Sequence, residues 1–111
     1  MRAALWSGSV ARLATLGFDF QEGFDDDTVA VYVDGERVFR RAHVTTQRLL
    51  GLAHSFHLER AEGPVMLLVL VETRRLIWSA RMRVAADVYL GISVVDGQLD
   101  VFSADKGFGY A

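Results

Sequence analysis

The chain has 111 residues, of which 51% are hydrophobic and 23% are charged, so it has the length of one domain and is too apolar to be disordered. It contains no cysteine, which excludes a disulfide framework, thiolate chemistry and a cysteine-based metal site. The formal net charge of −2 disfavours general binding to nucleic acid.

Residues 1–11 carry little pattern, and we expect either a loose leader or a short edge strand there. Their apolar run is too short for a signal peptide. The longest apolar run, 65–71, falls far below the roughly 20 residues of a membrane helix. We therefore expect one soluble domain over 1–111 without a membrane span, and the lack of cysteine favours the cytoplasm.

The first half of the chain alternates between apolar and polar residues with the period of two that is typical of strands. This pattern covers 12–20, and a β-branched strand at 28–33 follows an acidic segment. Asp34-Gly35 supplies two residues that tolerate the positive φ of a type I′ turn, so 36–41 returns as the partner strand. In this return strand the alternation assigns Val38 and Arg40 to one face and Arg37, Phe39 and Arg41 to the other.

Segment 47–60 fits two patterns. Leu49, Leu52, Ala53 and Phe56 have the spacing of a helical stripe, whereas the later residues alternate as in a strand. Because Gly51 weakens a helix and the surrounding segments are strand-like, we favour a strand with a bulge near Ala53-His54.

The second half continues with strands at 65–71 and 76–84. The first of these is apolar on both faces, as expected for the middle of a sandwich, and the second alternates arginines with apolar residues. Asp96-Gly97 supplies a second hairpin turn between 88–94 and 98–103. The aromatic residues of 104–111 indicate that this tail packs on the body. About eight strands at this spacing predict an all-β fold, an antiparallel β-sandwich of the jelly-roll or Ig-like kind.

The acidic loop 22–27 is the first candidate site. It contains three consecutive aspartates, and clustered carboxylates at the end of a sandwich are suitable calcium ligands. The spacing matches no EF-hand, and three adjacent side chains in an extended loop cannot all face one ion. The other interpretation is a solvated turn that prevents edge pairing of strands.

Basic residues accompany this loop. If neighbouring strands run up and down, loops 21–27, 42–46 and 73–75 lie at one end of the domain, and Arg40 joins the basic residues there. These charges either compensate the acidic loop or form a polar rim for an anionic or sugar ligand. Outward-facing tyrosines are typical of sugar sites. The candidate ligand-binding residues are Asp25, Asp26, Asp27, Tyr32, Arg41, His43, Arg74 and Arg75.

We find no catalytic motif in the sequence. His54 and His57 are one turn apart on a helix and could share a metal there, but on a strand they point to opposite faces. Ser55 lacks the Gly-x-Ser-x-Gly setting of a nucleophile elbow. We therefore expect no enzyme, no catalytic residue, no metal and no cofactor.

The apolar residues of 65–70, together with Leu49-Leu50, exceed what one inner face of a sandwich can accept. This surplus favours a non-enzymatic β-sandwich that acts through protein–protein contacts, with a protein partner or as a homo-oligomer. The alternative is a small ligand-binding module for carbohydrate or calcium that uses the acidic loop and exposed aromatic residues.

Overall fold

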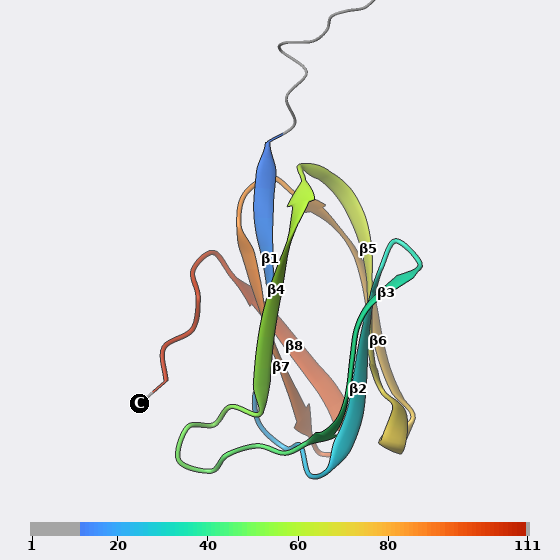
Figure 1. Ribbon diagram of the computed structural model, residues 1–111, viewed down its shortest axis with the longest axis vertical. Helices are drawn as coiled ribbons and strands as arrows, with labels where there is room; N and C mark the ends of the chain where they lie inside the picture. Colours follow the sequence, from blue (N-terminus) through green and yellow to red (C-terminus); the bar gives the residue numbers. More distant parts are fainter. Residues whose placement is uncertain (1–11, 111) are drawn as a thin grey trace, which may run out of the picture.

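The computed structural model describes residues 12–110 as two four-stranded sheets that pack face to face (Figure 1). Residues 1–11, for which we expected a loose leader or a short edge strand, lie outside the described range. The strands are β1 (Leu13–Phe20), β2 (Asp27–Val33), β3 (Glu36–Val44), β4 (His54–Ala61), β5 (Gly63–Val71), β6 (Leu76–Val84), β7 (Val88–Val95) and β8 (Gln98–Ala104).

The strand order is β4-β1-β7-β8 in one sheet and β3-β2-β5-β6 in the other. Neighbouring strands are antiparallel except for β1 and β7, which run parallel. The predicted all-β sandwich is therefore confirmed, with one parallel pair in it. Within 12–110, no helix is long and apolar enough to cross a membrane.

The core lies between the sheets and follows from the period of two along each strand. In β1 and β5 every second residue is buried, and Phe18, Phe20, Leu67 and Val69 are fully inaccessible to solvent. At one side of the sandwich, the ring of Phe39 on β3 stacks across the sheets on Phe56 of β4, with centroids 4.0 Å apart. Aromatic stacking thus closes this edge.

Both predicted Asp-Gly turns are confirmed. Asp34 and Gly35 have φ values of 50° and 83°, and Asp96 and Gly97 have 52° and 75°. Positive φ at both central residues is the signature of a type I′ turn, whose twist matches that of the flanking strands. These turns join β2 to β3 and β7 to β8.

Segment 47–60 is a strand only in its second part. β4 begins at His54 and pairs with β1 without interruption from Phe20↔His54 to Leu13↔Ala61, so the predicted bulge near Ala53-His54 is wrong. Residues 47–53 form a tight loop in which the Gly51 N–H donates to the Gln47 carbonyl at 2.8 Å. The positive φ of Gly51 allows this turn and ends the strand pattern.

A bulge lies in the first hairpin instead. The β2–β3 register shifts between Val31 and Tyr32, so Tyr32 pairs with Arg37, while Ala30 pairs with Arg40. The extra residue on β3 reverses the alternation beyond it. Arg37 and Arg40 therefore lie on the same face of the sheet, and the predicted assignment of these two arginines to opposite faces is wrong.

Candidate functional site

The acidic loop is held by a buried ion pair. Asp27, which is 2% exposed, accepts hydrogen bonds from Arg74 Nε at 3.0 Å and Nη2 at 2.8 Å, and from the Thr73 hydroxyl at 2.5 Å. The Asp25 backbone N–H donates to the same carboxylate at 2.9 Å, and Arg74 also donates to the Gly23 carbonyl. These contacts fasten the loop between β1 and β2 to the turn between β5 and β6.

The electrostatics of Asp27 follow from these contacts. Burial raises the pKa of its carboxyl, but the hydrogen bonds from Arg74, Asp25 and Thr73 and the charge of Arg74 lower it by more. The net pKa therefore lies below the usual value for an aspartate. Asp27 is a structural carboxylate at neutral pH, and its oxygen atoms are already used by protein donors.

Asp26 pairs with the second basic residue of the loop end. Its Oδ1 lies 2.6 Å from His43 Nδ1, and its backbone N–H donates to the Thr45 hydroxyl at 2.8 Å. Both side chains of this pair are largely exposed, so their attraction contributes at most about 1 kcal/mol. Charge compensation, the first of the two interpretations of this cluster, describes the Asp27–Arg74 pair, while Asp26 is hydrogen-bonded to the His43 ring.

The remaining predicted ligand residues are spread over the fold. Arg75 lies at the same end, exposed, in the β5–β6 turn. Arg41 lies on β3 beside His54, whose pKa is lowered by burial and then by the positive charge of Arg41. Tyr32 lies near the opposite end of β2, on the outer face of its sheet. The structure thus brings five of the predicted residues into two neighbouring sets of contacts, Asp25, Asp27 and Arg74 in one and Asp26 and His43 in the other, and leaves the remaining three outside them.

Metal binding finds little support in this arrangement. Within the part of the chain that the structure describes, no three or more His, Asp or Glu side chains are grouped so that they could hold an ion. Asp26 and Asp27 are instead directed at different partners, the His43 ring and the Arg74 guanidinium group.

A second feature lies on the solvent face of the β3-β2-β5-β6 sheet. The strand alternation that buries Leu67 and Val69 turns the neighbouring side chains of β5 outward, and these are also apolar. Met66 is 38% exposed and Ile77 of β6 is 69% exposed. We name this surface the outer patch; it consists of Tyr32, Met66, Leu68, Leu70 and Ile77.

Arginines border the outer patch on both edge strands. Arg37 and Arg40 lie on β3, and Arg81 and Arg83 lie on β6, all on the same face as the patch. We name these four residues the arginine rim. Arg40 is paired with Glu72, its Nη2 lying 3.0 Å from the carboxylate. The apolar centre is therefore bordered by arginines on its two strand edges, although the chain as a whole has a net charge of −2.

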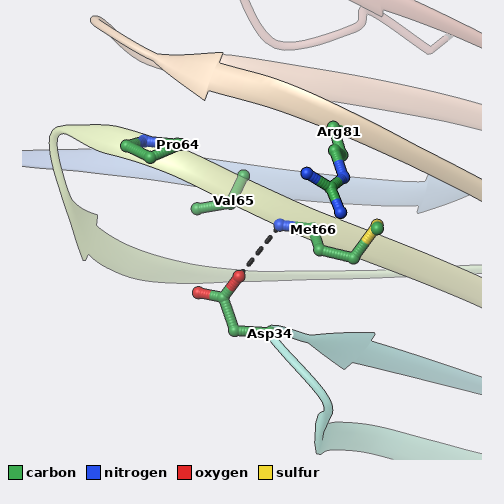
Figure 2. A pocket seen from close by; sticks show the side chains of 5 residues that line it. All are labelled: Asp34, Pro64, Val65, Met66 and Arg81. Atoms are coloured by element: carbon green, nitrogen blue, oxygen red, sulfur yellow. Dashed lines mark hydrogen bonds between the residues drawn. The ribbon is translucent and has the colours of Figure 1, made fainter.

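Two shallow hollows adjoin Met66 on this face. One of about 350 Å³ is lined by Tyr32, Leu68 and Ser79 as well, and one of about 230 Å³ includes Asp34 and Arg81. Figure 2 shows the second hollow, in which the Asp34 carboxylate accepts a hydrogen bond from the Met66 backbone N–H at 2.9 Å. The Asp34 side chain thereby provides an acceptor for the Met66 N–H of β5, just beyond the end of β2.

The two-sided apolar character of 65–71 was the sequence signal for this surface, but the arginine rim was missed. The rim requires the order β3-β2-β5-β6, which places the two arginine-bearing strands at opposite edges.

Comparisons of the chain with protein-family models, with curated proteins and with solved structures gave no match.

Proposed function

We propose that this protein is a non-enzymatic binding protein whose outer patch receives a segment of a partner protein that carries acidic and apolar side chains. The observation that carries the proposal is an apolar centre on the solvent face of a sheet, bordered by arginines on both edge strands. Arginine and aromatic residues are enriched among residues that dominate binding energy at interfaces.

The apolar centre would supply most of the affinity. Burying one large apolar side chain contributes about 1.5–3 kcal/mol, and Leu68, Leu70 and Ile77 are all accessible in part. The hollows beside Met66 can accept apolar side chains of the partner. Flat sheet faces gain specificity when such hollows fix the position of a few side chains.

The arginine rim favours an acidic partner over a second copy of the chain. In a two-fold homodimer the same patch meets itself, so the rim of one copy would face the rim of the other. Like charges at an interface are unfavourable, whereas carboxylates on a partner would pair with the guanidinium groups of Arg37, Arg81 and Arg83. Self-association through this patch is therefore the less favoured form of the proposal.

The acidic loop supports a binding function less well. The carboxylates of Asp26 and Asp27 are engaged by His43 and Arg74, so a sugar or calcium ion would have to displace these contacts.

We place the proposed binding activity in the cytoplasm, in keeping with a chain that contains no cysteine.

The proposal is tested with three synthetic peptides of equal length in which leucine alternates with aspartate, serine or lysine. Titration into ¹⁵N-labelled protein should give amide shifts on β2, β5 and β6 with the aspartate peptide. Leu68→Asp and Arg81→Glu should each weaken this binding at least about tenfold, and added salt should weaken it further.

Matched controls are available elsewhere on the chain. Leu49→Asp changes a leucine that is 94% exposed on the β3–β4 loop, and Arg48→Glu changes the neighbouring arginine, so neither should affect peptide binding. Equal binding of the aspartate and lysine peptides, or undiminished binding to the Arg81→Glu protein, contradicts the proposal. Light scattering that shows a dimer dissociated by Leu68→Asp would replace the acidic partner with a second copy.

A further inference from the structure

A separate hollow of about 460 Å³ lies on the outer face of the other sheet. It is bounded by β1 and β4, by the β3–β4 loop at Leu52, and by the segment 105–110, which we name the tail segment. Figure 1 shows this segment leaving β8 and running along the outer side of the sheet. The volume is within the range of sites that hold small molecules.

A glycine makes room at the floor of the hollow. Gly17 on β1 lies between His57 of β4 and Tyr89 of β7 in the sheet register. A Cβ atom at Gly17 would come within 2.4 Å of Cδ1 of Tyr89, so the tyrosine ring occupies the space that a side chain at position 17 would take. The ring of Tyr89 can do so only because residue 17 has no side chain, and it gives the hollow an aromatic wall.

The tail segment is fixed by contacts at two points. The ring of Phe108 meets Phe102 of β8 edge to face, with centroids 5.3 Å apart. The Tyr110 hydroxyl donates to Asp19 Oδ2 at 2.6 Å and accepts from Gln21 Nε2 at 2.9 Å. These contacts confirm that the tail packs on the body, and they hold a second aromatic ring, that of Phe108, beside the hollow.

The charge in the hollow comes from one carboxylate. Among the described residues that line it, Asp19 is the only acid, and no lysine or arginine is present. Within 12–110 no basic side chain forms an ion pair with Asp19. An uncompensated carboxylate next to aromatic faces attracts a cation by charge, by hydrogen bonds and by cation–π interaction.

We propose that this hollow binds a small organic amine whose ammonium group is held by Asp19 and whose apolar body packs on Tyr89 and Phe108. The neighbouring Ser55 and His57 add polar groups on the β4 side. This site lies on the opposite sheet from the outer patch, so it does not depend on the function proposed above.

The test uses benzylamine with benzyl alcohol as its uncharged counterpart, each titrated into ¹⁵N-labelled protein. Benzylamine should shift amides of β1, β4 and the tail segment and should bind at least about tenfold more tightly than benzyl alcohol. Asp19→Asn should remove this preference. Asp100→Asn, which changes an exposed aspartate of β8, should retain it.

A second variant tests the hollow itself. Ser55→Trp should fill the space from the exposed edge strand while leaving Asp19 in place, and it should abolish binding of both probes. Leu68→Asp on the opposite sheet should change neither affinity. Equal binding of benzylamine and benzyl alcohol, unaltered binding to the Asp19→Asn protein, or preferential binding of methyl glucoside would overturn the proposal.

Discussion

Asp27 shows how one residue can organise a loop. Its carboxylate is nearly inaccessible to solvent and receives hydrogen bonds from Arg74, Thr73 and the Asp25 backbone. A buried charge is stable only when its hydrogen-bonding capacity is satisfied, and here the donors come from two turns that are distant in the sequence. Asp27 thus joins β1–β2 to β5–β6 at the loop end of the sandwich.

Asp27→Ala should lower the free energy of unfolding by about 3 kcal/mol, measured by chemical denaturation. The reason is the loss of several charge-assisted hydrogen bonds to Arg74. The expected loss of stability lies at the lower end of the range for a broken buried ion pair, because the Arg74 side chain is 34% exposed and becomes hydrated in the variant. Asp25→Ala is the control, since only its backbone contacts Asp27, and it should change stability by less than about 0.5 kcal/mol.

Acid unfolding provides a check on the same residue. Because the folded pKa of Asp27 is lowered, its stabilising contribution is present above the unfolded value of about 3.9 and is lost as the pH falls through the folded value. The stability difference between the wild-type protein and Asp27→Ala should therefore shrink as the pH falls below about 4. A difference that stays constant down to pH 2 would contradict the assigned pKa.

At the scale of an element, β5 is the strand that links the fold to the proposed function. Its residues Val65, Leu67, Val69 and Val71 belong to the core between the sheets, and Met66, Leu68 and Leu70 belong to the outer patch. It lies between β2 and β6, so its backbone is paired on both sides over most of its length. Pro64 fits near its start because β2 pairs with β5 only from Leu67 onward, and the missing N–H therefore costs no hydrogen bond to β2.

Two adjacent leucines of β5 allow a paired experiment. Leu67→Ala should lower the free energy of unfolding by about 2–5 kcal/mol, because Leu67 is fully buried and its removal leaves a cavity. Leu68→Ala should cost less than about 1 kcal/mol, because Leu68 faces solvent in part, yet it should weaken binding of the acidic peptide. Denaturation and peptide titration of both variants measure this. Equal losses of stability would show that Leu68 belongs to the core.

At the scale of the whole molecule, the two outer faces of the sandwich have different characters. One carries the outer patch with its arginine rim, and the other carries the hollow at Asp19 beneath the tail segment. The buried core separates them, so each face can be altered without direct contact with the other. Tyr110 attaches the tail segment to the second face and offers a spectroscopic signal for its docking.

Burial and the hydrogen bond to Asp19 raise the pKa of Tyr110 to about 12. Since this folded pKa exceeds the unfolded value of about 10, the contribution of docking is complete below pH 10 and is lost as the pH rises through 12. Absorbance at 295 nm should show one of the three tyrosines ionising near pH 12. Tyr110→Phe should remove that late step, whereas Tyr32→Phe should leave it intact.

Local sequence determined most of the strand pattern. Alternation at 12–20 and 76–84, and the positive-φ tolerance of Asp34-Gly35 and Asp96-Gly97, predicted strands and turns because these properties depend on neighbouring residues alone. Alternation did not predict the tight loop at 47–53, which the positive φ of Gly51 closes. It also did not predict the bulge that moves Arg37 onto the face of Arg40. A register shift is decided by pairing between strands, which alternation within one strand does not report.

The candidate sites depended on tertiary structure to a greater degree. The sequence indicated an excess of apolar residues at 65–71 and a charged loop end, and it led us to expect an aromatic tail that docks. Only the strand order places the arginines of β3 and β6 on either side of β5, and only the parallel pairing of β1 with β7 brings Tyr89 over Gly17. These contacts join residues dozens of positions apart, and it is the packing of two sheets around one core that selects them.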